Sequence, residues 1–488
     1  MKMSSPDLFE LVQSLTPSER RHFSLRIGEK DLHYGLLFRS LLEMPVFDEG
    51  ALLRELRKKG GGKNLSVAKR HLYFLLLDDL LAARSRSIED EVRRACDHIR
   101  ILRAKGLAEQ ARKLLRRNKK KAHEFELYRP LLDLIELEKM MLGNRSEEKE
   151  LERLYREEAG CLEKLGNTNA YWRLTTQIGR LQRQYQKMPG EAQQKALDAL
   201  NRDPLLSQLD QATTLQSKIY FLRAKSTYYF TVGQPEEAYL LNEQLLHLLE
   251  NSPSFLKQFP EIYLHTFNNF LIDSLLLQRF EALALGLEKL SSLSGKPAFR
   301  QIKDLEAQLF RQRYLLEINW QLSTGNIEKA VALISGIERG LERFGARLLK
   351  PHRVTLEYLL AYLSLLDGRH DRSAHWISRL LQEKEDVVLE VFQFTRILNL
   401  LLHFDLGNWE HLSYLILSTR RYLRQRRALY RTETALLQFL QRSINLPAAE
   451  RRLLRQAFVQ EVGALAEHPE EKRFFNYIDL KVWVGNEM

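Results

Sequence analysis

Residues 224–251 have the pattern of two helices joined by a tight turn, and much of the chain repeats this plan. Gly233 can adopt the positive φ that ends one helix, and Pro235 can open the next because its φ is already fixed. Ala238 follows five residues after Gly233, where a small side chain lets two helices approach closely. The stretch therefore predicts an antiparallel helical hairpin.

Turn markers of this kind recur every 37 to 48 residues. They stand at Gly106, Gly143, Gly190, Gly233, Leu277, Gly325, Gly368 and Gly407. A small residue follows five or six positions later at Ala111, Ala238, Ala282, Ala330 and Ala374. Self-similarity at about 20 to 50 residues indicates stacked helical units that cannot bury their apolar faces alone. No long segment alternates at a period of two, so the predicted fold class is all-α.

Three units carry a family resemblance, namely GQPEEAYLLNEQLLHLL, TGNIEKAVALISGI and KGLAEQARKLL. They resemble the tetratricopeptide repeat (TPR), whose unit places a turn glycine five residues before a small alanine of the second helix. The resemblance covers roughly residues 90–445, although the spacing exceeds the family's usual length of about 34 residues. It implies a right-handed α-solenoid of antiparallel helix pairs that binds a peptide or helix of another protein in its groove.

The two ends of the chain depart from the repeat pattern. At the N-terminal end, Thr16, Pro17 and Glu19 have the spacing of a capping box that opens a helix. At the C-terminal end, a last helix is expected from near Pro469, with an apolar stripe at positions 474, 478 and 482. The predicted organisation is an N-terminal helical domain (1–88), a TPR-like helical repeat array (89–445) and C-terminal capping helices (446–488).

The sequence contains no catalytic or metal-binding motif that we could identify. Cys96 and Cys161 are the two cysteines, which favours a reducing compartment over a disulfide framework. The first residues include Asp7 and Glu10 and no long apolar core, which argues against a secretory signal. The longest apolar runs, such as 72–77, are far shorter than the roughly 18 residues of a membrane span. We therefore predict a cytoplasmic, non-enzymatic protein without cofactor, metal or membrane contact.

Positive charge is concentrated in residues 50–121, which hold 21 Lys and Arg against 8 Asp and Glu. This local excess of +13 accounts for the whole net charge of +12. Within the segment, Lys69 and Arg70 lie near the start of a helix that follows a glycine-containing turn, which keeps a DNA-binding helix-turn-helix open as an interpretation. The densest basic patch consists of Arg112, Lys113, Arg116, Arg117, Lys119, Lys120 and Lys121.

A second basic cluster comprises Arg420, Arg424, Arg427 and Arg431. If this segment is one helix, the spacing of 4, 7 and 11 residues places all four side chains on one face. Guanidinium groups pair bidentately with carboxylate or phosphate, so such a face favours an anionic partner. A solubilising surface is the alternative interpretation.

The leading hypothesis is a protein–protein interaction scaffold whose partner presents an acidic or extended segment. Polar and aromatic residues on the first helix of each pair are the candidate contacts, because stacking does not require them there. They are Tyr228, Tyr229, Asn268, Asn269, Asn319 and Gln321. The alternative is a nucleic-acid-binding or regulatory protein that uses the basic 50–121 segment, with the repeats as a sensor or dimerisation module.

Overall fold

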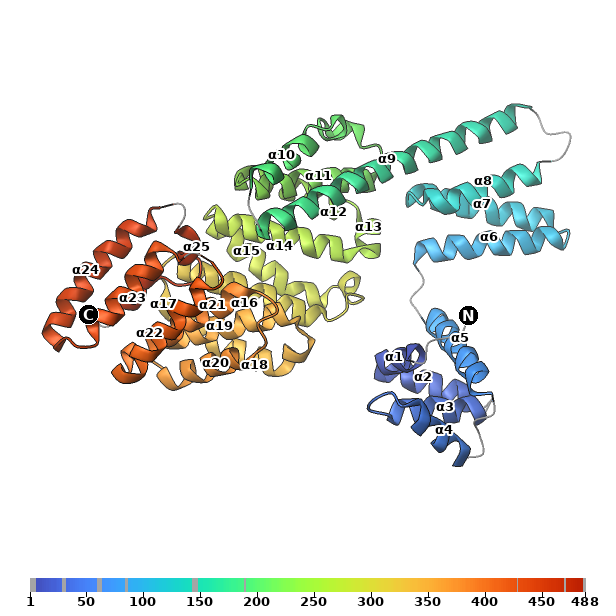
Figure 1. Ribbon diagram of the computed structural model, residues 1–488. Coiled ribbons are helices and arrows are strands. Elements are labelled where there is room, and N and C mark those ends of the chain that lie inside the picture. Colours follow the sequence, from blue (N-terminus) through green and yellow to red (C-terminus); the bar gives the residue numbers. More distant parts are fainter. Residues whose placement is uncertain are drawn as a thin grey trace. The chain divides into compact units, whose positions relative to one another are not determined.

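The computed structural model describes residues 6–28, 32–58, 64–83, 87–142, 148–187, 190–427, 429–468 and 471–485. These ranges are helical and contain no strand, which confirms the all-α class (Figure 1). Within them, no helix combines the length and low charge that crossing a bilayer requires. The chain divides into two compact units, Met1–Asn118 and Lys119–Met488.

The first unit begins with helices that share one hydrophobic core, in which the rings of Phe23 and Phe38 lie 4.9 Å apart. The predicted capping box is confirmed, since the Thr16 amide donates to Glu19 Oε2 (2.7 Å) and the Glu19 amide donates to Thr16 Oγ1 (3.3 Å). The helices are α1 (Asp7–Ser14), α2 (Pro17–Gly28), α3 (Leu32–Glu43), α4 (Glu49–Lys58), α5 (Leu65–Ala83), α6 (Ile88–Ala104) and α7 (Ala108–Glu124), the last of which continues into the second unit.

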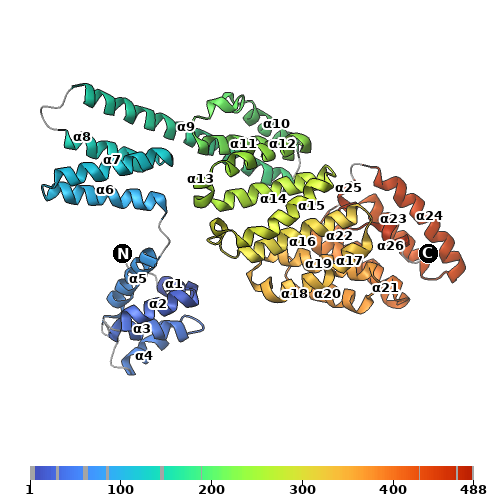
Figure 2. The same ribbon diagram turned by 180° about the vertical axis from the view of Figure 1, so that it is seen from behind.

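In the second unit, helices that follow one another along the chain pack together, as α11, α12, α14 and α15 do in Figures 1 and 2. The helices are α8 (Tyr128–Met141), α9 (Glu148–Lys187), α10 (Glu191–Asn201), α11 (Leu215–Thr231), α12 (Pro235–Glu250), α13 (Pro253–Gln258), α14 (Pro260–Leu276), α15 (Phe280–Ser292), α16 (Leu305–Ser323), α17 (Ile327–Ala332), α18 (Ile334–Phe344), α19 (Lys350–Leu366), α20 (His370–Gln382), α21 (Leu389–Asp405), α22 (Trp409–Arg424), α23 (Arg431–Ser443), α24 (Ala448–Ala466), α25 (Lys472–Phe475) and α26 (Leu480–Gly485).

One type of turn joins seven pairs of consecutive helices among the described residues, namely α6–α7, α7–α8, α11–α12, α14–α15, α16–α17, α19–α20 and α21–α22. A residue with positive φ ends the first helix, and the amide of the next residue donates to the carbonyl five positions earlier, as from Gln234 to Tyr229 (2.9 Å) and from Asn326 to Gln321 (2.9 Å). This is the Schellman arrangement, which satisfies carbonyls that a helix end leaves open. The positive-φ residues of these turns are Gly106, Glu126, Gly233, Gln278, Gly325, Gly368 and Gly407.

Three of the predicted turn markers do not mark a turn of this type in the described structure. The turn predicted at Leu277 is centred on Gln278, and Gly190 begins α10 in extended backbone (φ −162°) and forms no turn of this type. Gly143 lies outside the described residues. The turn at Glu126 was not predicted, because nothing in the sequence indicates that a glutamate adopts a positive φ there.

In these seven turns, the residue five positions after the positive-φ residue is fully buried, with 0% exposure. This confirms the expected burial of Ala238 and Ala330. Ala282 and Ala374 were each placed one residue away from the buried position: both are half-buried, and Leu283 and Ser373 occupy it instead. The full set is Ala111, Leu131, Ala238, Leu283, Ala330, Ser373 and Leu412.

The expected last helix is wrong, because the chain there forms two short helices, α25 and α26, separated by a turn. Phe474 and Ile478 are buried as expected, but Val482 is only half-buried. Trp483 and Val484 are the buried residues of α26, since the break changes which face points inward.

Candidate anion-binding row

The predicted tyrosines both lie on α11, the first helix of a hairpin. Tyr228 Oη donates to Asp198 Oδ1 (2.8 Å) and so is already hydrogen-bonded within the chain. Tyr229 is half-buried, and Lys225 Nζ lies 5.1 Å from its ring centroid. Of the pair, Tyr229 retains a polar group for which no hydrogen bond is observed among the described residues.

The predicted amides lie on the first helices α14 and α16. Asn268 is half-buried and Asn269 is exposed. Asn319 is exposed and donates from Nδ2 to Leu315 O of its own helix (2.6 Å). Gln321 is buried, and its Oε1 has no hydrogen-bond partner. These positions are therefore compatible with a binding surface on the first helices, which stays a prediction.

A row of cationic side chains occupies the same first helices and was not predicted. We use the term cationic row for Arg223 on α11, His265 on α14, Arg311 on α16 and His352 on α19. Arg311 Nη1 lies 2.6 Å from His352 Nε2, which joins α16 to α19. Because a guanidinium can only donate, His352 Nε2 accepts this bond and its ring is neutral.

The members of the cationic row influence one another electrostatically. Burial, followed by the positive charge of Arg311, lowers the pKa of His352 to about 4. Desolvation, followed by the charges of Arg223 and Arg311, lowers the pKa of His265, although its ring remains exposed to solvent. The charges of Arg223 on α11 and Arg311 on α16 thus disfavour the protonated form of His265.

The two arginines of the row are half-buried, and burial lowers the pKa of each. Neither forms an ion pair with any residue that the structure describes, and Arg311 Nε is buried without a hydrogen-bond partner. The carboxylate of Glu261, on the same helix as His265, opposes the effect of the two arginines on that ring. The row is thus a desolvated positive surface that the chain leaves almost uncompensated.

One signal in the sequence could have found this row. Its members are 42, 46 and 41 residues apart, which is close to the 43 to 47 residues between the turns at 233, 278, 325 and 368. Basic residues that recur at the repeat interval on first helices indicate equivalent positions on successive hairpins. Charges that cluster along the chain do not reveal this row, because each of its members comes from a different helix.

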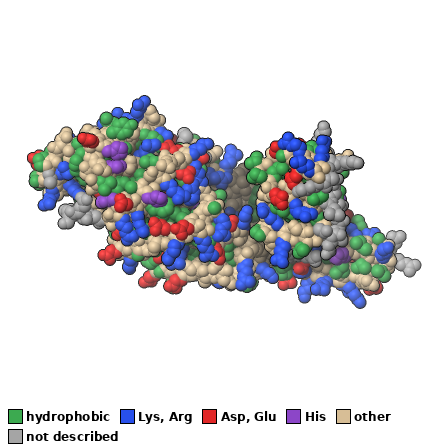
Figure 3. Space-filling view, turned by 90° about the horizontal axis from the view of Figure 1, so that it is seen from below, with side chains coloured by type: hydrophobic (Ala, Val, Ile, Leu, Met, Phe, Trp, Pro, Cys, Tyr) green, Lys and Arg blue, Asp and Glu red, His purple; other side chains and the backbone are tan. Residues whose placement is uncertain are grey.

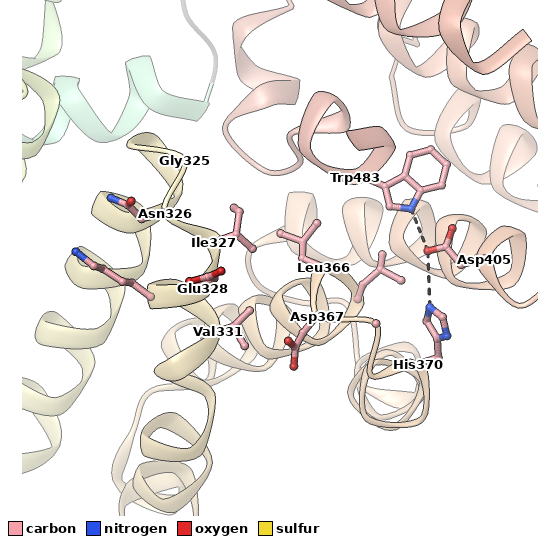
Figure 4. A pocket seen from close by; sticks show the side chains of 13 residues that line it. Gly325, Asn326, Ile327, Glu328, Val331, Leu366, Asp367, His370, Asp405 and Trp483 are labelled. Carbon is pink, nitrogen blue, oxygen red and sulfur yellow. Dashed lines mark hydrogen bonds and ion pairs between the residues drawn. The ribbon is translucent and has the colours of Figure 1, made fainter. Parts of the chain in front are cut away.

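The next first helices, α19 and α21, are covered by the C-terminal segment, residues 471–485. Tyr358 Oη donates to Tyr477 O (3.0 Å), Tyr362 Oη accepts from the Asp479 amide (3.0 Å), and the Tyr477 ring stacks on Phe394 at 4.4 Å. Trp483 Nε1 donates to Asp405 Oδ2 (3.0 Å), and His370 Nε2 lies 3.9 Å from the same oxygen (Figure 4). α19 and α21 therefore hold the chain's own C-terminal segment through aromatic stacking and through side-chain hydrogen bonds to its backbone.

A cavity of about 700 Å³ lies beside this covered face (Figure 4). Its lining comes from the turns at Gly325 and Gly368 together with Asp405, His370 and Trp483. No group of three or more His, Cys, Asp or Glu side chains suited to a metal occurs among the described residues. The cavity lining gives no indication of a reaction type.

The predicted arginine face at 420–431 does not lie on one helix. α22 ends at Arg424, Arg427 lies in the connection, and Arg431 begins α23, so the expectation of one continuous stripe is wrong. Arg427 donates from Nη1 (3.0 Å) and Nη2 (2.7 Å) to the carboxylate of Glu433, which is 1% exposed. The chain turns here because this carboxylate also accepts from the Tyr430 amide at the start of α23 (3.0 Å).

Arg420 and Arg424 remain on one side of α22, where they line a shallow hollow of about 320 Å³ with Leu417. Neither forms an ion pair with another described residue. On the face drawn in Figure 3, Lys and Arg side chains lie among Asp and Glu side chains. A solubilising role and a partner contact both remain open for these two residues.

The basic patch on α7 is partly internal. Lys119 is 8% exposed and pairs with Glu138 and Glu157, the latter at 2.7 Å, so it differs from its exposed neighbours. Arg112 pairs with Glu109 (2.6 Å), and Lys121 is half-buried. The exposed members without an ion pair to a described residue are Lys113, Arg116, Arg117 and Lys120.

Of the two basic residues in the helix-turn-helix interpretation, Lys69 and Arg70, the structure makes Lys69 inaccessible to DNA. Lys69 is 7% exposed, pairs with Glu49 and lies 5.6 Å from the centroid of the Phe47 ring. A lysine in this position is a structural part of the α1–α5 domain and cannot reach a base edge without leaving its partner. Arg70 is exposed.

No protein-family model, curated protein or solved structure matches this chain. The residues themselves therefore carry the functional argument.

Proposed function

We propose that this protein is a non-enzymatic interaction scaffold that binds a peptide segment of another protein across the first helices of its hairpins. The observation that carries the proposal is the cationic row, which places half-buried arginines without an ion-pair partner among the described residues on first helices α11 and α16, and histidines on α14 and α19. A charge buried without a partner costs stability, and such costs are commonly retained at functional sites. The partner then supplies the anionic groups that the chain lacks.

The C-terminal segment supports the same proposal. It lies on α19 and α21, where tyrosine hydroxyls and an indole hold an irregular piece of chain. α11, α14 and α16 are first helices of the same hairpin type, with Tyr229, Asn268 and Asn269 on them. A partner segment bound there would be held by the same kinds of contact.

The finer architecture belongs to this proposal. Seven turns of one geometry, each followed at the fifth position by a buried residue, support a TPR-like array of stacked pairs. We propose that the array is a right-handed α-solenoid acting in the cytoplasm. An experimental structure of the full chain would test the handedness directly.

Site-specific photo-crosslinking tests the scaffold function. A benzophenone amino acid is placed at Asn269, exposed on first helix α14, and in a control at Leu285, 68% exposed on second helix α15. We expect irradiation in a lysate of the source organism to give a discrete protein adduct at position 269 and none at 285. Adducts of equal yield at both positions, or at neither, would contradict binding on the first helices.

Nucleic-acid binding is a second candidate, favoured by the four exposed cations of α7 without ion pairs to described residues. Binding through phosphates releases counterions, so affinity should fall linearly with the logarithm of salt concentration. Replacing Arg116 and Arg117 by Gln should reduce that slope by roughly 2, at about 0.9 per phosphate contact. An unchanged slope would remove this candidate.

A further inference from the structure

Helix α5 is apolar on two opposite sides. Its inner side packs on α1, α2 and α3 (Figure 1), and Leu72 and Leu76 on that side are buried. Its outer side carries large apolar side chains that are between 37% and 64% exposed to solvent. They are Val67, Phe74, Leu77 and Leu81. A contiguous apolar patch of this kind, unlike a single exposed leucine, is typical of an interaction surface.

Two opposite charges lie within this patch. Arg70 and Asp78 are exposed and stand four positions before and four positions after Phe74, so the helical period brings them onto the same side. Neither forms an ion pair with another residue that the structure describes. We use the term α5 outer face for Val67, Arg70, His71, Phe74, Leu77, Asp78 and Leu81.

The α5 outer face is complementary to itself when two copies of the helix run in opposite directions. With Phe74 of both copies at the centre, each residue faces the one that is equally far on the other side of Phe74. Arg70 then faces Asp78, and Val67 faces Leu81. A two-fold axis makes each of these contacts twice. A parallel pair would instead bring Arg70 against Arg70 and Asp78 against Asp78, and such like-charge contacts are unfavourable.

We propose that two copies of this chain associate through their α5 outer faces, with the two α5 helices antiparallel and the two-fold axis at Phe74. The mirrored charges identify the occupant, because they match this same helix. The remaining mirrored residues are His71, whose ring lies 4.8 Å from the Tyr34 ring, and Leu77, which adds an aliphatic contact. The association does not depend on the proposed scaffold function. It places two repeat arrays in one assembly, so a partner with two binding segments would gain avidity.

Sedimentation velocity on the full chain tests the association. A contact centred on one helix pair lies at the small end of protein interfaces, so the measurement covers about 1 to 200 µM. We expect a concentration-dependent dimer, weakened about tenfold or more by Phe74→Glu, which brings two carboxylates together at the axis. Leu25→Glu is the matched control, since Leu25 is 68% exposed on α2 of the same domain, and it should dimerise as the wild type does.

An exchange of charges distinguishes a second copy from any other partner. Arg70→Asp and Asp78→Arg each place like charges opposite one another, so either substitution alone should weaken the dimer. The double variant restores opposite charges and should recover the affinity of the wild type. An equimolar mixture of the two single variants should form heterodimers for the same reason. Circular dichroism melting of each variant shows whether a lost dimer reflects unfolding.

Disulfide cross-linking tests the direction of the helices. Val67→Cys mixed with Leu81→Cys should give a cross-linked dimer under mild oxidation. Val67→Cys alone should give none, because the two copies of residue 67 lie about 21 Å apart along antiparallel helices, beyond the reach of a disulfide. The natural cysteines, Cys96 and Cys161, are buried and so should not interfere.

Three results would overturn the proposal. They are a wild type that stays monomeric over this concentration range, equal weakening by Phe74→Glu and Leu25→Glu, and a double charge variant that dimerises no better than the single ones. Cross-linking of Val67→Cys to itself would contradict the antiparallel arrangement and, with it, the pairing of Arg70 with Asp78. A monomeric wild type would mean that a different molecule covers the α5 outer face.

Discussion

The first helices of the hairpins in the second unit fall into two sets, which differ in whether another segment of the chain covers their surface. On α19 and α21 the surface is apolar and covered, with the rings of Tyr358 and Phe394 against Tyr477. On α11, α14 and α16 it carries the first members of the cationic row, and no such segment is seen on it among the described residues. Hairpins of one geometry therefore carry both a surface that another segment covers and a surface without such a covering segment.

The polar groups of the two regions differ in the same way. Around the covered face, Glu471 accepts from the amides of Arg431 (2.9 Å) and Thr432 (3.0 Å), and Trp483 donates to Asp405. In the open region, the guanidinium groups of the half-buried Arg223 and Arg311 have no carboxylate partner in the part of the chain that the structure describes. Satisfied buried groups stabilise a fold, whereas unsatisfied ones cost free energy that a ligand can recover.

The largest expected effect comes from opening the covered face with Trp483→Ala. Trp483 is 3% exposed and is hydrogen-bonded to Asp405, so the substitution leaves a cavity and a carboxylate without its indole donor. We expect a loss of about 3–5 kcal/mol in the free energy of unfolding, measured by urea denaturation. The control Trp172→Ala, at a residue 53% exposed, should cost far less. Similar losses in both variants would mean that the C-terminal segment does not stabilise α21.

A smaller loss is expected at the corner between α22 and α23 from Arg427→Gln. The substitution leaves Glu433, 1% exposed, without its charged partner. Because Arg427 retains some solvent contact, we expect a loss of about 2–4 kcal/mol rather than the full cost of a buried unpaired charge. Arg424→Gln, three residues earlier on an exposed position, should change stability by less than about 0.5 kcal/mol. Equal effects would show that the Glu433 pair contributes nothing.

The hairpins could be predicted because the signal for them is local. A glycine before a small residue at the fifth position reports a turn and a close approach, and Gly233 with Ala238 is of this type. Glu126 and Gln278 adopt the same backbone conformation without a glycine, so those turns were missed or displaced by one residue. A turn is mispredicted where a residue other than glycine adopts the positive φ, because such a residue gives no signal of that conformation in the sequence.

The candidate site could not be predicted from charge spacing along the chain. The predicted stripe from Arg420 to Arg431 required one continuous helix. In the structure α22 ends at Arg424, and Glu433 caps the start of the next helix, α23. The cationic row takes one residue from each of four helices, and the contact between Arg311 and His352 spans 41 positions. The repeat interval is visible in the sequence. Which residues at that interval lie next to one another depends on the positions of the turns in the structure.

The pH dependence of stability tests the contact between the two sets of first helices, because His352 on α19 accepts from Arg311 on α16. The pKa of His352 is lowered from 6.5 to about 4 on folding, so the unfolded chain binds the proton more readily. The stability from the neutral ring is present above pH 6.5 and is lost as pH falls toward 4. Allowing for solvent screening, we expect this residue to contribute about 1–2 kcal/mol to that loss.

The measurement compares urea denaturation at several pH values between the wild type and His352→Gln, whose amide oxygen can still accept from Arg311. We expect a shallower decline for the variant over this window. His375→Gln, at an exposed histidine of α20, should decline as the wild type does. Parallel curves for all three proteins would contradict the neutral state of His352.

The smallest effect, and the one with the opposite sign, is expected from Arg311→Met. Methionine keeps most of the length of the side chain and removes a desolvated charge that lacks an acidic partner. Stability without ligand should therefore stay the same or rise by up to about 1 kcal/mol, because relief of desolvation offsets the lost hydrogen bond to His352. The matched control is Arg353→Met, which leaves Glu357, 1% exposed, with Arg379 (3.1 Å) in place of two arginines and removes a partner of Glu383, and it should be clearly destabilising. If Arg311→Met is as destabilising as Arg353→Met in thermal melts, Arg311 is a structural residue, and the contrast between an open and a covered set of first helices does not hold.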